Sequence, residues 1–313
     1  MSLSIQTSFA SMVTQNSLSS ANDKLTTSME RLSTGYAVNS SADDAAGLSI
    51  ATRMQAQSDG ITVAQDNVED ASSMLSTVDG ALESMVDIVG RMKDLATQAA
   101  NDTYSDDDRS AMQTEYDDLS KQLTSVMDNT SFGGTDLMSA GTTTTAGTVV
   151  TTSGAGLLAA TAVNFQVGAS SSETLSVNIS SGLSDIRTSI DSAASYVAAT
   201  AAHGTVAAVA ATAGTELASS SSASSTIDDL DSLLTNISDV RSSVGASVNR
   251  LDYISDNLTN MQENTDTAIG NIMDADYASE TSEMSKQQLL EQAGISVLSS
   301  VSESQSLIKN LLS

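Results

Sequence analysis

The fold is decided by the stretch Ile50–Ala99, which reads IATRMQAQSDGITVAQDNVEDASSMLSTVDGALESMVDIVGRMKDLATQA. Apolar residues recur along it at alternating steps of four and three, which is the spacing of a coiled-coil seam. The residues predicted to form this long-helix core are Ile50, Met54, Ile61, Val68, Leu75, Val78, Leu82, Met85 and Val89. The helix would be about 75 Å long, and so narrow an apolar stripe needs partner helices along its whole length.

A matching stripe lies near the other end of the chain. Its predicted core residues, again three or four positions apart, are Leu234, Ile237, Val244, Leu251 and Leu258. Two long seams in one chain predict an antiparallel pair of helices. A shorter third helix is predicted to begin after Ser105, whose hydroxyl would cap it ahead of the acidic run Asp106–Asp108, and to end near Asn129.

Thinner apolar stripes occupy both extreme ends of the chain. The residues predicted to form these terminal polymerisation seams are Ile5, Phe9, Met12, Leu18, Leu25 and Leu32 at the start, and Leu290, Val297, Val301, Ile308 and Leu311 at the end. Short segments that are this rich in Ser, Thr, Asn and Gln form marginal helices on their own. We therefore expect them to be disordered in a free subunit and to fold against neighbouring molecules.

The centre of the chain is rich in Ser, Thr, Ala and Gly and poor in charge. Short strands are predicted on either side of Gly133-Gly134, and again at residues 164–168 and 174–179. The Ala/Ser-rich low-complexity stretch that follows is predicted to carry no site. The fold class predicted for the whole chain is mainly α, with long antiparallel coiled-coil helices formed by both chain ends, a small central β-region and no, or only vestigial, outer domains.

Four regions are expected along the chain. Residues 1–40 and 280–313 would be the terminal helices, residues 41–137 and 227–279 the long-helix bundle, residues 138–190 the small β-region, and residues 191–226 an Ala/Ser-rich surface insert.

Composition excludes most chemistry. The 313 residues contain no Cys and one His, so disulfides, thiolate metal sites and multi-His sites are all excluded. No catalytic residue, metal site or cofactor is predicted, and we expect that the protein is not an enzyme. A formal net charge of −27 argues against binding to nucleic acid or to an anionic membrane. The first charged residue is Asp23, so no signal peptide is predicted.

The segment Asn39-Ser40-Ser41-Ala42-Asp43-Asp44-Ala45-Ala46-Gly47 resembles a loop of the bacterial flagellins. Within it, Asn39, Asp43, Asp44 and Gly47 are the residues assigned to the family loop motif. The other matching segments are residues 30–35, 249–251 (Asn249-Arg250-Leu251), 272–278 and 292–298. The resemblance covers about residues 1–180 and 225–313.

The resemblance implies a structural subunit of the flagellar filament. Such a chain would assemble with itself through its terminal helices, which line the inner tube, and the resulting helical tube would transmit motor torque for swimming. The resemblance also implies export to the outside of the cell without a cleaved signal peptide. The further partners that it implies are a flagellar export chaperone, a cap protein and hook-junction proteins.

One further motif concerns recognition of the protein by a host receptor. Arg91, Leu95 and Glu115 match the pattern of flagellins that a vertebrate innate immune receptor recognises, although these residues are equally compatible with contacts between subunits. Two alternatives to a filament subunit stay open. One is a hook–filament junction protein of the same superfamily, and the other is a coiled-coil signalling module, which belongs to a different class.

Overall fold

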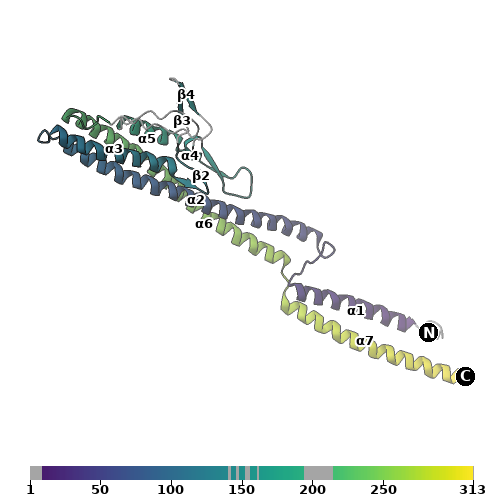
Figure 1. The fold of residues 1–313 in the computed structure, drawn as a ribbon. Helices are drawn as coiled ribbons and strands as arrows, with labels where there is room; N and C mark the ends of the chain where they lie inside the picture. Colours follow the sequence, from purple (N-terminus) through teal and green to yellow (C-terminus); the bar gives the residue numbers. More distant parts are fainter. Residues whose placement is uncertain are drawn as a thin grey trace. The chain divides into compact units, whose positions relative to one another are not determined.

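The computed structural model describes residues 9–139, 142–145, 148–151, 156–160, 162–193 and 214–312 (Figure 1). The helices are α1 (Phe9–Thr34), α2 (Ala45–Ala99), α3 (Asp106–Asn129), α4 (Leu157–Ala160), α5 (Ser180–Ala193), α6 (Ser220–Met273) and α7 (Tyr277–Leu312). The strands are β1 (Ser131–Phe132), β2 (Thr135–Asp136), β3 (Thr142–Thr145), β4 (Thr148–Thr151), β5 (Val163–Gln166) and β6 (Thr174–Val177). The predicted mainly α fold is confirmed.

The chain divides into two compact units. One unit contains Met1–Asp59 and Met261–Ser313, and the other contains Gly60–Asn260. Helices α2 and α6 contribute residues to both units.

The first unit contains the helix pair α1 and α7, which lie side by side (Figure 1). The inward residues recur at steps of three and four: Ser11, Thr14, Leu18, Ala21, Leu25, Ser28 and Leu32 on α1, and Glu280, Met284, Gln287, Glu291, Gly294, Leu298 and Val301 on α7. A Cβ atom at Gly294 would lie 3.4 Å from Leu18 Cδ1, so the helices approach closely there. Because Ser28 and Gln287 are buried in this seam, it holds less apolar surface than a typical coiled coil.

The second unit is a bundle whose core is built from α2, α3, α5 and α6. The predicted core residues Ile61, Val68, Leu75, Val78, Leu82, Met85 and Val89 on α2, and Ile237, Val244, Leu251 and Leu258 on α6, are all buried. Gln65 bonds to Thr259 and Lys93 pairs with Asp231, so position numbers rise along α2 as they fall along α6. The predicted antiparallel pairing of the two long helices is therefore confirmed in this unit.

Three positions differ from the expected long-helix core. Ile50 is 40% exposed, because the inward positions of its turn belong to the small residues Gly47 and Ala51. Met54 and Leu234 are only half-buried. Leu233 takes the fully buried position instead of Leu234.

Helix α3 begins with a capping box at Ser105. The Ser105 hydroxyl oxygen accepts a hydrogen bond from the Asp108 backbone N–H at 3.3 Å, and the Asp108 carboxylate accepts one from the Ser105 N–H at 3.1 Å. These contacts satisfy donors that the first turn of a helix otherwise leaves open. The helix ends at Asn129, so both of its predicted ends agree with the structure.

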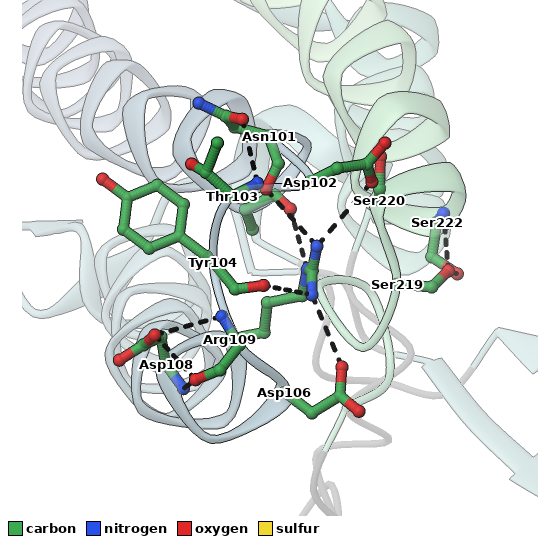
Figure 2. Close-up of polar contacts among 12 residues, drawn as sticks. Asn101, Asp102, Thr103, Tyr104, Asp106, Asp108, Arg109, Ser219, Ser220 and Ser222 are labelled. Atoms are coloured by element: carbon green, nitrogen blue, oxygen red, sulfur yellow. Dashed lines mark hydrogen bonds and ion pairs between the residues drawn. The ribbon is translucent and has the colours of Figure 1, made fainter.

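Arg109 closes the turn between α2 and α3 (Figure 2). Its guanidinium donates to the carbonyl oxygens of Ala99, Asn101 and Tyr104 at 3.0, 3.3 and 2.9 Å. A buried cation at this point interacts favourably with the negative end of the α2 dipole. Ser220, at the start of α6, adds a hydrogen bond to the Ala100 carbonyl, so the ends of three helices are joined here.

The β-region consists of two-stranded antiparallel hairpins, β1–β2, β3–β4 and β5–β6, in the described part of the chain. Gly133 and Gly134 form the β1–β2 turn with φ values of 58° and 82°, a conformation that glycine adopts without steric cost. The sequence did not predict α5, which packs Leu183, Ile186 and Ile190 into the bundle core.

Residues 191–226 were expected to form a surface insert, but several residues in the last part of this stretch are buried. Residues 194–213 lie outside the described residues, but Leu217 and Ala223 are fully buried. Helix α6 begins at Ser220, before the boundary at residue 227 that the sequence suggested. The end of this stretch is therefore part of the bundle.

Candidate functional site

The predicted terminal seam divides into an inward and an outward set. Leu18, Leu25, Leu32 and Val301 are half-buried between α1 and α7. Phe9, Met12, Leu290 and Val297 are exposed, Phe9 by 83%. Ile5 lies outside the described residues, and Ile308 and Leu311 lie in α7 with side chains outside the described part.

More large apolar side chains are exposed on the same two helices. We define the terminal apolar surface as Phe9, Met12, Val13, Met29, Leu289, Leu290, Ile295 and Val297. Consecutive residues of a helix are about 100° apart, so Met12 and Val13 point to different sides of α1. Exposed apolar surface of this extent marks a contact with other molecules.

The family loop motif builds the connection between α1 and α2. Asp44 caps α2, because its Oδ1 accepts hydrogen bonds from the N–H groups of Ala46 and Gly47 at 3.0 and 2.9 Å. A Cβ at position 47 would lie 2.5 Å from Asp44 Oδ2, so a larger residue there would force the capping carboxylate to shift. Asn39 Nδ2 donates to the Tyr36 carbonyl at 3.4 Å.

Asp43 stabilises the same loop through hydrogen bonds to Ser40. Its Oδ2 accepts hydrogen bonds from the backbone N–H and the hydroxyl of Ser40, each at 2.9 Å. Since both bonds favour the charged carboxylate, they hold the pKa of Asp43 below its ordinary value.

The two connections of this unit, α1 to α2 and α6 to α7, are paired through their backbones. The Ala37 N–H donates to the Met273 carbonyl at 2.6 Å, and the Ala275 N–H donates to the Gly35 carbonyl at 2.9 Å. Gly35 has a φ of 81°, which lets α1 end and the chain turn. The Tyr277 hydroxyl adds a bond to the Leu32 carbonyl at 3.1 Å.

Arg31 connects three segments of this unit. From α1, its guanidinium pairs with Glu280 of α7 at 3.0 Å and with Asp43 of the loop at 3.9 Å. The three side chains are 16–30% exposed, so the charges are only partly screened by water. We call Arg31, Asp43 and Glu280 the junction triad.

The three residues of the receptor motif do not share one surface. Arg91 and Glu115 are exposed and form an ion pair at 2.6 Å between α2 and α3. Leu95 is 3% exposed and packs in the bundle core. The expectation that Leu95 forms part of a surface epitope is therefore not met in the folded subunit.

Sequence reasoning missed a buried polar cluster beside α3. Gln113 Nε2 donates to Asp117 Oδ1 and to Glu216 Oε2, both at 2.7 Å, while its Oε1 accepts from the Leu217 N–H at 2.7 Å. The Gly214 N–H donates to Asp117 Oδ2 at 3.3 Å. This cluster fixes residues 214–217, which lead into α6, against α3.

The neighbouring Tyr116 holds the end of α5 against α3. Its hydroxyl donates to the Ala193 carbonyl at 2.6 Å, and burial raises the pKa of that hydroxyl. Adjacent residues of α3, Tyr116 and Asp117, thus hold Ala193 and Gly214. The only local signal in the sequence is the Gln113–Asp117 pair, four residues apart on one helix.

The described residues lack the features of two other classes of site. They contain no group of three or more His, Cys, Asp and Glu side chains placed to hold a metal ion. Among them, no helix is both long and apolar enough to cross a membrane.

Paired end helices with exposed apolar side chains, in a chain that also forms a bundle of long helices, define a subunit that assembles with other molecules. Comparison with known proteins identifies the family. The "Bacterial flagellin N-terminal helical region" matches residues 5–144 and the "Bacterial flagellin C-terminal helical region" matches residues 227–312. The chain belongs to the bacterial flagellin family, whose members are structural subunits of the extracellular flagellar filament and are not enzymes.

Individual relatives agree with this assignment. The chain is 32% identical to a flagellin of Listeria innocua over 312 residues, which is 99% of both chains. It is 30% identical to flagellin B of Vibrio cholerae over 375 aligned positions that cover all of both chains. A putative flagellar hook-associated protein from Vibrio parahaemolyticus shares the fold, with a TM-score of 0.52 and 17% identity over 74% of this chain and 100% of that one. The full-length matches favour a filament subunit over the junction-protein alternative.

Proposed function

We propose that the terminal apolar surface is the contact through which this filament subunit polymerises. The observation that carries the proposal is the division of apolar residues on α1 and α7. Their shared seam buries polar residues such as Ser28 and Gln287, while side chains as large as Phe9 and Leu289 are exposed. Since burial of one such side chain contributes about 1.5–3 kcal/mol, association of the end helices is strongly favoured.

The same division supports disorder of the terminal segments in a free subunit. A seam that contains Glu291, Gly294 and Ser28 contributes little stability to an isolated helix pair. The helices would then become ordered as the polymer forms, with the entropy cost of ordering offset by the newly buried surface. In the filament, we propose that the α1–α7 pairs line the inner tube and that the long-helix bundles surround them.

Because the chain belongs to the flagellin family, we also propose that it binds other proteins of the flagellum. Hook-junction and cap proteins would meet the subunit at the ends of the filament, and an export chaperone would cover the terminal apolar surface before assembly. Export would proceed without cleavage of a signal peptide. Edman sequencing of filament protein tests the last point, because a cleaved chain would not begin at the Met1 end.

The immune receptor is a further proposed partner, and its proposed epitope on the folded subunit is limited to Arg91 and Glu115. Arg91 and Glu115 are accessible on the folded subunit, whereas Leu95 would act only by supporting the packing of α2. A receptor reporter assay on monomer tests this, and we expect Glu115→Gln to weaken the signal. An unchanged signal would remove Glu115 from the proposed epitope, and no signal from the wild type would remove the receptor from the proposed partners.

The polymerisation proposal is tested by truncation. Deletion of residues 1–30 or 285–313 should leave a soluble and folded core that forms no filaments. Negative-stain electron microscopy after addition of a precipitating salt reads the outcome, and circular dichroism verifies that the core is helical. Filaments formed by either truncated chain would refute the proposal.

A further inference from the structure

One cation of the second unit is left without an internal partner. The other described Lys and Arg side chains of residues 60–260 pair with carboxylates of the same chain: Arg91 with Glu115, Lys93 with Asp231, Arg109 with Asp106, Lys121 with Asp118, Arg187 with Asp128 and Arg241 with Asp79. Arg250 on α6 is exposed, and no ion pair joins it to any described residue. Arg250 is therefore the one described cation of residues 60–260 that no carboxylate of the same chain neutralises.

An exposed aromatic side chain lies beside it. Tyr253 is 77% exposed and follows Arg250 by three positions, so the two residues share one side of α6. Neither residue belongs to the bundle core, which takes Leu251 and Leu258 from this part of the helix. Arg and Tyr are among the residues that contribute most to protein interfaces. We call Arg250 and Tyr253 the α6 patch.

A surface of opposite charge lies on α2. Asp66, Glu69, Asp87 and Asp94 are exposed, and within the described residues no ion pair neutralises any of them. At about 100° per residue, Asp66, Asp87 and Asp94 lie on the side of α2 opposite its buried seam, and Glu69 lies at the edge of that side. That seam, which includes Leu75, Val78 and Leu82, packs in the core shared with α6. The acidic face of α2 therefore points away from the Arg250 of its own chain.

We propose that the α6 patch binds the acidic outer face of α2 on a second copy of this chain. This inference rests on the proposed polymerisation and names a contact between long-helix bundles that adds to the terminal one. Charge complementarity selects the occupant, because Arg250 is the uncommitted cation among the described residues of this unit and the outer face of α2 carries uncommitted carboxylates. The contact decides which faces of two acidic subunits can approach without repulsion.

The test uses the full-length protein and measures the critical concentration for filament formation. We expect Arg250→Glu to raise it about tenfold or more at low salt, with a smaller effect at high salt, because the contact is electrostatic. Arg250→Lys should stay close to wild type. Lys121→Glu is the matched control, because it makes the same change of charge at a cation that is already paired within α3.

A charge swap identifies the partner surface. Arg250→Glu combined with Glu69→Arg and Asp87→Arg should restore the wild-type critical concentration to within about threefold. Assembly of Arg250→Glu at the wild-type concentration would overturn the proposal, and so would failure of the swap to restore it. Neither result bears on the proposed terminal contact. That proposal has its own test, and it fails if chains that lack residues 285–313 still form filaments.

Discussion

Arg241 on α6 donates two hydrogen bonds to the carboxylate of Asp79 on α2, at 2.8 and 3.2 Å, across a sequence separation of 162 residues. The hydrogen bonds from Arg241 to Asp79 raise the pKa of the guanidinium above its ordinary value. Heptad seams alone allow two helices to slip by one repeat, whereas a two-pronged pair of this kind fixes one register. The Asp79–Arg241 pair therefore aligns the long helices of the bundle.

Loss of this pair should weaken the bundle moderately. We expect Arg241→Met to lower the free energy of unfolding by about 1 kcal/mol or less, because both side chains are about one-third exposed and water screens the charges. Thermal unfolding of the monomer measures the change. Lys121→Met, at a pair within one helix, should have a smaller effect. Equal effects of the two substitutions would show that the Arg241 pair has no special role.

The capping box of α3 should make part of the stability depend on pH. Hydrogen bonds from Ser105 lower the pKa of Asp108 from its ordinary value of 3.8. A carboxylate with a depressed folded-state pKa stabilises the fold above its unfolded pKa, and this contribution is lost as pH falls through the folded pKa. Asp108→Asn should therefore destabilise the protein near neutral pH, with the difference shrinking below about pH 4.

A neighbouring carboxylate provides the control for this prediction. Asp107 lies in the same first turn, but no hydrogen bond to Ser105 involves it. Asp107→Asn should change the unfolding temperature less than Asp108→Asn at neutral pH. The same pH dependence in both variants would assign the effect to the helix dipole and contradict the role of the capping box.

Gln113 should be among the polar residues on which the bundle depends most. Gln113→Leu removes the amide that bridges two buried carboxylates, so Asp117 and Glu216 lose a donor that water cannot replace. We expect a loss of about 2–4 kcal/mol in the free energy of unfolding, measured by urea denaturation. Gln122→Leu, at an exposed position of the same helix, is the control and should be nearly neutral.

Salt should strengthen assembly. Each subunit carries a net charge of −27, so packing of subunits brings like charges together. Because the screening length falls from about 30 Å at 0.01 M salt to about 10 Å at 0.1 M, the critical concentration for filament formation should fall over this range. Light scattering measures it, and a critical concentration that rises with salt would contradict the prediction.

The sequence predicted the parts of the fold that depend on local spacing. Residues such as Leu75 and Val78 could be assigned to a seam because the period of a helix fixes which positions share a face. Ile50 failed as a core residue because close approach at its turn favours the small Ala51 over a large apolar side chain. The capping box at Ser105 was predictable because all of its atoms lie within four residues of sequence.

Features that depend on distant contacts could not be predicted. The Gln113–Glu216 hydrogen bond spans 103 residues, and nothing near Gln113 indicates that it is buried. Leu95 matched a surface motif in sequence, yet its side chain is enclosed by the bundle. The division of the terminal residues into inward Leu18 and outward Phe9 likewise required knowledge of how α1 and α7 pair.

The most direct test of the central claim is electron microscopy of full-length chains whose terminal apolar surface carries a charge. Leu290→Asp and Val297→Asp change exposed side chains of α7, so the subunit should stay folded while the polymer contact is lost. Asn101→Asp adds the same charge at the α2–α3 turn and keeps the acceptor for the Thr103 N–H. We predict filaments from wild type and Asn101→Asp and none from either α7 variant. Normal filaments from Val297→Asp and Leu290→Asp would show that this surface is not where subunits join.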